Sequence, residues 1–144
     1  MNSIRIGTSW WNYEDWRGLF YPETLPKDKW LEFYAQNFDT IEVNATFYHE
    51  MRASTYEKWR ESTPPGFCWA VKASRFITHI NRLRGVREPL QRFFASASAL
   101  GDKLSVVLFQ LPPSLVFDVC LVQEFGDALH DVLVDGLRCL RLFR

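Results

Sequence analysis

Polar and apolar residues alternate in one short segment of the chain, residues 41–46, within a stretch otherwise suited to a buried strand. Alternate side chains of a strand point to the same side, so Glu42, Asn44 and Thr46 are predicted to share one face. Polar groups that are removed from water need hydrogen-bond or ionic partners. This row therefore indicates either internal pairing or a place where a polar ligand binds.

Lys72 and His79 follow the next predicted strand and carry groups that move protons or hold anions. Lys72 closes the apolar stretch Trp69–Val71, and His79 comes soon after it. A glutamate beside a lysine can transfer protons or bind an anion, and a histidine can act as acid, base or metal ligand. We predict Glu42, Lys72 and His79 as the catalytic candidates. The structural alternatives are an internal pair of Glu42 with Lys72 or Arg5, and a backbone partner for His79.

Further candidates come from the residues at the other predicted strand ends. The predicted ligand-binding residues are Thr8, Trp10, Asn44, Thr46, Tyr48, Thr78 and Gln110. A metal needs three or four converging ligands, and the only further candidate ligands beside Glu42 and His79 are His49 and Glu50. We therefore predict no metal site, and the sequence indicates no particular cofactor.

The elements that must position these residues are short apolar runs separated by helical patterns. Five runs are predicted as strands covered on both faces: Ile4–Ile6, Thr40–Val43, Phe67–Val71, Leu104–Phe109 and Leu137–Leu142. Repeated strand-helix units of roughly 30 residues are typical of parallel sheets with right-handed crossovers. We expect one domain that spans residues 1–144.

Helical signals separate the predicted strands. An aromatic stripe predicts a helix over Lys27–Asn37, and a capping box at Ser54–Glu57 predicts the start of a second helix. A third is predicted after Pro89, with Gly101 at its end, and Asp118 is predicted to cap a fourth.

Two architectures fit this order of elements, a small open sheet and one half of an eight-stranded barrel. The segment after the first strand, residues 7–11, reads Gly-Thr-Ser-Trp-Trp and is too bulky for a pyrophosphate. This favours the first half of a TIM-type (β/α) barrel, with about four βα units and a terminal strand. In such a barrel, the carboxyl ends of the strands share one mouth, where we place the candidate residues.

Composition limits the classes of function. The formal net charge is zero, the pI is about 6.8, and 47% of the residues are apolar, which predicts a folded protein without bulk attraction to nucleic acid or membranes. Three widely spaced cysteines are predicted as reduced, mostly buried thiols, and no apolar run approaches the ~20 residues that span a bilayer. We therefore expect a soluble, cytoplasmic protein without a membrane partner.

Several motifs together resemble the YecE-like family, domain of unknown function 72. They are IGTSWW at residues 6–11, WRGLFYP at 16–22, FDTIEVNATFY at 38–48, TPPGF at 63–67, VK at 71–72, ITH at 77–79 and LFQLPP at 108–113. The resemblance implies a TIM-type barrel and carries no assigned activity. Family members are longer, and their fifth strand has an acid where this chain has Leu142. We therefore expect a member of the family that is truncated at its C-terminus.

Three functions remain open, and the sequence does not decide whether the protein is an enzyme. The first is a pocket for a small polar or anionic ligand. The second is nucleic-acid binding, with the basic stretch Lys72–Arg92 on phosphates and the aromatic loop Trp10–Tyr21 on bases, although those rings could instead pack over the barrel mouth and the first helix. The third is a nonfunctional fragment, whose open edge would favour self-association.

Overall fold

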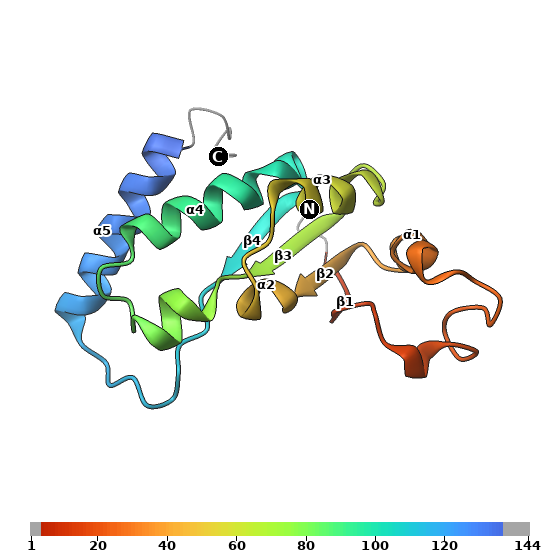
Figure 1. The fold of residues 1–144 in the computed structure, drawn as a ribbon, viewed down its shortest axis with the longest axis horizontal. Helices are drawn as coiled ribbons and strands as arrows, with labels where there is room; N and C mark the ends of the chain where they lie inside the picture. The colour runs from red at the N-terminus through yellow and green to blue at the C-terminus, as the bar shows by residue number, and fades with distance from the viewer. Residues whose placement is uncertain (1–3, 137–144) are drawn as a thin grey trace.

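The computed structural model of the chain describes residues 4–136 and contains one parallel sheet of four strands. The strands are β1 (Gly7–Ser9), β2 (Thr40–Val43), β3 (Cys68–Lys72) and β4 (Leu104–Leu108), and they pair in the order of the sequence (Figure 1). Each strand therefore returns beside its predecessor after a helical crossover, as in successive units of a βα barrel. The predicted strand Leu137–Leu142 lies outside the described residues.

The crossovers contain helices of several kinds. The α-helices are α1 (Trp30–Asn37), α2 (Ala45–Tyr48), α3 (Ala53–Glu61), α4 (Arg87–Ala97) and α5 (Val119–Gly136). Three short 3-10 helices, Glu14–Trp16, Lys27–Lys29 and Ser98–Lys103, and one π-helical turn, Phe76–Ile80, complete the described secondary structure. The turn Phe76–Ile80 follows β3 directly and belongs to the candidate site.

Burial alternates along the two central strands. Ile41, Val43, Trp69 and Val71 are buried in the main core, whereas the alternate residues of β2 and β3 are partly buried. Helices α1, α3 and α4 supply the buried partners of the first face. The expectation of strands covered on both faces is not met within residues 4–136, where the second face is only partly buried and Val106 and Leu108 of β4 are exposed.

Aromatic rings make up much of the core beside the sheet. The ring of Tyr21 stacks on Trp30 with centroids 4.4 Å apart, and Trp59 of α3 stacks on Trp69 of β3 at 5.5 Å. Trp11 meets Trp69 edge-on at 5.8 Å. The aromatic loop after β1 thus packs against α1 and the core, as expected from its structural interpretation.

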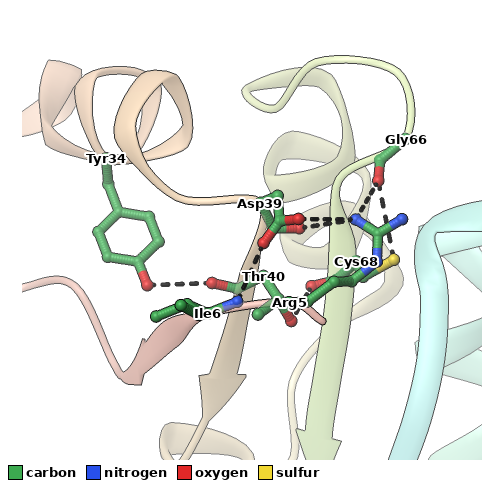
Figure 2. A network of polar contacts seen from close by, with 7 residues as sticks. All are labelled: Arg5, Ile6, Tyr34, Asp39, Thr40, Gly66 and Cys68. Atoms are coloured by element: carbon green, nitrogen blue, oxygen red, sulfur yellow. Dashed lines mark hydrogen bonds and ion pairs between the residues drawn. The ribbon is translucent and has the colours of Figure 1, made fainter. Parts of the chain in front are cut away.

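The amino-terminal ends of β1, β2 and β3 are joined by a polar network (Figure 2). Arg5 donates hydrogen bonds to the Gly66 carbonyl at 3.0 Å and to the Asp39 carboxylate at 3.4 Å, which in turn accepts one from the Ile6 N–H. Tyr34 of α1 donates to the Thr40 carbonyl at 3.0 Å. These bonds fix the end of the sheet that, in a barrel, supports stability rather than chemistry.

The first strand differs from the prediction. Ile4 and Ile6 are 89% and 68% exposed, and the strand starts at Gly7. A Cβ at Gly7 would lie 2.0 Å from the Thr40 carbonyl oxygen, so the backbones of β1 and β2 approach closely only at a residue without a side chain. This close approach, and not the apolar pair before it, determines where pairing begins.

The helix boundaries agree with the sequence in part. The capping box is wrong, because α3 begins at Ala53 and no side chain caps it. The predicted third helix begins at Arg87, so Pro89 lies in its first turn, where a missing N–H costs little. The cap at Asp118 is confirmed, since its carboxylate accepts hydrogen bonds from the backbone N–H groups of Cys120 and Leu121 at 3.0 and 3.2 Å.

The cysteines are less buried than expected. Cys68 is partly buried and Cys120 is exposed, and both are free thiols. Cys120 lies in the first turn of α5, on the side of the helix that faces away from the core, and Cys139 lies outside the described residues. None of the helices in residues 4–136 is both long enough and apolar enough to cross a membrane.

Candidate functional site

Lys72 lies at the carboxyl end of β3 and is positioned by an aromatic ring. Its ammonium nitrogen is 4.5 Å from the ring centroid of Phe47, in the range of a cation–π interaction. Phe47 is buried and comes from α2, the short helix directly after β2. The end of one strand and the loop of its neighbour therefore hold the lysine head group at the rim of the sheet.

His79 contacts the same ring. The His79 and Phe47 ring centroids are 4.9 Å apart and the planes are nearly perpendicular. The fully buried Thr78 hydroxyl is 2.8 Å from Nδ1 of His79. Because this contact engages Nδ1, Nε2 is the ring nitrogen left to meet a ligand. Single π-helical turns such as Phe76–Ile80 are frequent at functional sites.

Tyr48 completes the group around Phe47. Its ring meets the Phe47 ring edge-on at 4.9 Å, and the residue is 62% exposed, so its hydroxyl is open to solvent. We call Phe47, Tyr48, Lys72 and His79 the Phe47 cluster. Three predicted residues thus meet at one aromatic ring, at the carboxyl ends of β2 and β3.

Glu42 lies on the open face of the sheet and on the same side as Lys72. It is opposite Ala70 in the register of β2 and β3, and Lys72 is two residues beyond Ala70. In the part of the chain that the structure describes, the Glu42 carboxylate forms no ion pair with Lys72 or Arg5; the latter pairs with Asp39 instead. The internal pairing considered for Glu42 is therefore absent within that part.

The predicted polar row of Glu42, Asn44 and Thr46 is wrong, because the strand ends at Val43 and the chain turns into α2. Asn44 precedes the helix with helical backbone angles, and its carbonyl accepts the Phe47 N–H at 3.0 Å. Thr46 is buried, and its hydroxyl lies 2.6 Å from the Lys72 carbonyl oxygen. It links the ends of β2 and β3 and does not belong to a row along the strand.

Three other predicted residues lie apart from the Phe47 cluster. The backbone N–H and the hydroxyl of Thr8 both donate to the Tyr34 hydroxyl, at 2.8 and 3.0 Å, so Thr8 faces α1. Trp10 has a φ of 86° and packs on Trp11, with ring centroids 4.1 Å apart. Gln110 is exposed and follows the end of β4.

Phe47 is the residue that sequence reasoning missed. An aromatic residue beside a buried strand normally belongs to the core, and Phe47 is indeed buried. The signal that could have identified it is its position between Thr46 and Tyr48, immediately after the strand that carries Glu42. A ring at that place must lie beside the end of the next parallel strand, where Lys72 is found.

Two of the six basic residues in the predicted stretch Lys72–Arg92 are paired with carboxylates. Arg92 donates to the Glu88 carboxylate at 2.6 Å and to that of Glu50 at 3.2 Å, and Arg87 forms an ion pair with Asp131. Across residues 4–136, no group of three or more His, Cys, Asp or Glu side chains is arranged to hold a metal ion. Thr46 is the sole predicted site residue that lines the cavity of about 310 Å³ between α2, α4 and the turn Phe76–Ile80.

Comparison with known proteins agrees with this architecture. A crystal structure of a DUF72 family protein from Thermotoga maritima MSB8 is similar with a TM-score of 0.75 and 28% sequence identity, over 91% of this chain and 52% of that one. A DUF72 family protein from Enterococcus faecalis V583 has a TM-score of 0.66 at 18% identity, over 85% of this chain and 44% of that one. Together with the parallel sheet, these likenesses show the α/β fold of a TIM-type barrel, of which the chain forms the first half.

Sequence comparison leads to the same family. UPF0759 protein YunF of Bacillus subtilis (strain 168) is 33% identical over 116 residues, and UPF0759 protein YecE of Escherichia coli (strain K12) is 28% identical over 109 residues. Each alignment covers 76% of this chain, which spans 40% of YunF and 38% of YecE. The family model described as "Protein of unknown function DUF72" matches residues 5–140. The chain therefore belongs to the DUF72 family.

Proposed function

We propose that the Phe47 cluster binds a small anionic ligand at the carboxyl ends of β2 and β3. The observation that carries this proposal is the position of the Lys72 ammonium, 4.5 Å from the Phe47 ring centroid and without a carboxylate partner among the described residues. A lysine held in this way has its three N–H donors available for a ligand.

His79 and Tyr48 support the proposal because they place two more polar groups around the same ring. Nε2 of His79 is left free by the Thr78 contact, and the Tyr48 hydroxyl is exposed. Both can donate hydrogen bonds to an anion that is bound by Lys72. Gathered donors and a fixed positive charge are the usual means by which proteins hold carboxylate or phosphate groups.

Glu42 is the residue that would extend the role of this site from binding to proton transfer. Its carboxylate lies on the open face of the sheet beside the strand that ends in Lys72. In a ligand complex, Glu42 would accept a proton or a hydrogen bond from the part of the ligand that is not held by Lys72. We propose catalysis by Glu42, Lys72 and His79 only as a second step, which requires that the Phe47 cluster binds an anion.

An NMR titration of the labelled chain with inorganic phosphate and with succinate tests the proposal. We expect the backbone signals of Lys72 and His79 to shift, and Lys72→Ala to weaken binding about tenfold or more, since a charged hydrogen bond contributes roughly 1.5–3 kcal/mol. Lys58→Ala is the matched control, because it removes the same charge from the exposed surface of α3. Equal effects of the two variants, or no shift with either anion, would refute the proposal.

A single-stranded oligonucleotide in the same titration separates the small-ligand proposal from nucleic-acid binding. Binding to phosphate groups of a polymer falls steeply with salt, whereas a small built site depends on salt only weakly. The burial of Trp11 and Tyr21 removes two rings from the aromatic loop that stacking would need. Tight, salt-sensitive binding of the oligonucleotide that is unaffected by Lys72→Ala would favour the polymer instead.

A cytoplasmic location is part of the proposal. Cys68 and Cys120 are free thiols, and thiols remain reduced in the cytoplasm. Because Cys120 is exposed, an oxidising compartment would expose it to cross-linking. Labelling of the thiols in intact cells, followed by mass spectrometry, would show whether Cys120 is reduced in its native compartment.

A further inference from the structure

A second binding site is suggested by the cavity that lies beside the Phe47 cluster on the helix side of the sheet. The cavity has a volume of about 310 Å³ and is bounded by the segment between α2 and α3, by the turn Phe76–Ile80 and by α4. In Figure 1 the segment between α2 and α3 passes along α4, and the Glu50–Arg92 hydrogen bond joins the two. We call this cavity the α4 pocket. Its volume lies at the lower end of the range of small-molecule sites, roughly 300–1,000 Å³.

The charges in the α4 pocket are balanced. Arg92, the one arginine of its lining, donates to the carboxylates of Glu50 at 3.2 Å and of Glu88 at 2.6 Å. An anion would have to displace these carboxylates and then lie beside them, which costs Coulomb energy. The pocket is therefore unsuited to the phosphate or carboxylate groups that we propose for the Phe47 cluster.

Tyr56 brings a phenolic hydroxyl to the lining of the α4 pocket. The residue is 1% exposed and lines the cavity, and its hydroxyl makes no hydrogen bond with any described residue. Burial raises the pKa of this phenol, so it stays protonated and can donate. A ligand hydroxyl in the pocket would supply the partner that this phenol lacks within residues 4–136.

Ser74 and Ser96 add hydrogen-bond donors and acceptors to the lining of the α4 pocket. Oγ of Ser74 accepts the Phe76 N–H at 3.2 Å, which leaves its own O–H free to donate. Ser96 of α4 lines the pocket, and its side chain makes no hydrogen bond within residues 4–136. Together with Tyr56 they offer donors and acceptors at several places, as a ligand with several hydroxyl groups requires.

Most of the remaining lining of the α4 pocket is apolar, with Thr46 and His49 as the polar exceptions. Phe76 and Phe93 contribute aromatic rings and Ile77 an aliphatic side chain. A pyranose ring has one face made of C–H groups, which packs on such walls, and hydroxyl groups at its edge, which need polar partners. From the balanced charge, the unpartnered hydroxyls and the apolar walls, we infer that the α4 pocket binds an uncharged, polyhydroxylated ring compound of about the size of a monosaccharide.

Saturation-transfer NMR with a set of methyl glycosides, the methyl α- and β-pyranosides of glucose, galactose and mannose, tests this inference. We expect at least one glycoside to receive saturation from the protein, and Tyr56→Phe and Ser96→Ala each to weaken its binding about fivefold, the value of one neutral hydrogen bond. Tyr13→Phe is the matched control, because it removes a phenolic hydroxyl from the exposed loop after β1. Circular dichroism of each variant verifies that it is folded.

Inorganic phosphate provides the second arm of the experiment and separates the two sites. We expect excess phosphate to leave the glycoside signal unchanged, whether or not phosphate binds at the Phe47 cluster. Displacement of the glycoside by phosphate would overturn the inference, because it would show an anion site in the α4 pocket. So would the absence of a signal from every glycoside in the set, or an equal loss in Tyr56→Phe and Tyr13→Phe.

Discussion

Phe47 holds polar side chains in place at the ends of the strands, although it contributes no polar atom of its own. Lys72, His79 and Tyr48 all contact its ring, and none of them is fixed by an opposite charge among the described residues. An aromatic face attracts a cation less strongly than a carboxylate does, so it positions the lysine without neutralising it.

Tyr56 predicts a stability that falls in alkaline solution. Burial raises its pKa above the ordinary value of about 10, so above that pH the unfolded chain gives up a proton that the folded chain keeps. Stability is then complete below about pH 10 and decreases as the pH rises further, by up to about 1.4 kcal/mol per pH unit for this group. Urea unfolding between pH 8 and pH 11 measures the slope.

Tyr56→Phe is expected to reduce this slope without abolishing it. The pKa of Tyr21 is raised chiefly by burial and secondarily by Tyr34, so Tyr21 keeps part of the dependence. Between pH 8 and pH 9 these tyrosines are protonated in the folded and in the unfolded chain, so their ionisation should not change the free energy of unfolding of either protein. A slope that is the same in both proteins above pH 10 would show that Tyr56 does not ionise on unfolding as we argue.

The candidate residues whose place in the fold could be predicted are those that depend on strand ends alone; their role in a site stays a prediction. Lys72 ends β3 and His79 follows it, and the parallel pairing of β2 with β3 brings that end close to the end of β2. The position of Asn44 and Thr46 could not be predicted in the same way, because it depends on where β2 gives way to α2. Local alternation cannot show where a strand ends when the next helix begins without a capping side chain.

At the scale of the elements, central strands were easier to predict than the first one. The bounds predicted for β2 agree with the structure, and those for β3 and β4 differ by one residue at the ends, because the apolar runs coincide with the strands. The predicted strand Ile4–Ile6 failed, since pairing with β2 requires a residue that lets two backbones approach. Such a requirement is a property of the pair of strands and is invisible in one strand's composition.

Gly7→Ala is therefore expected to destabilise the protein strongly. Its Cβ would lie 2.0 Å from the Thr40 carbonyl oxygen, so β1 must move away from β2, at a cost of about 3 kcal/mol. Gly126→Ala is the matched control, because its Cβ would meet nothing within 4 Å and alanine favours the helix α5. Urea unfolding measures both; a Gly7→Ala protein as stable as Gly126→Ala would contradict the close approach.

The whole molecule leaves one face of its sheet and the edge strand β4 uncovered within the described residues. Val106 of β4 is 54% exposed, and Leu108 on the same face is also exposed. In the longer relatives, this chain corresponds to about two fifths of the length. An open parallel edge beside exposed apolar side chains favours association with another strand.

We predict that the 144-residue chain self-associates through β4. Val106→Lys should shift the protein toward the monomer in size-exclusion chromatography with light scattering, because a charged side chain on an edge strand opposes pairing. Val116→Lys makes the same change at an exposed position in the loop after β4 and should have little effect. A wild-type protein that stays monomeric as its concentration rises would exclude this mode of association.

Four of the six tryptophans lie within one group that joins the loop after β1, helix α3 and strand β3. Neighbouring ring centroids are 4.1 Å apart for Trp10 and Trp11, 5.6 Å for Trp11 and Trp59, and 5.5 Å for Trp59 and Trp69. Indole rings at such separations couple their electronic transitions and pass excitation from one to another. The protein consequently carries its own optical signal for the docking of these three segments, visible as a split ultraviolet dichroism band and as depolarised emission, both of which change when any one segment detaches.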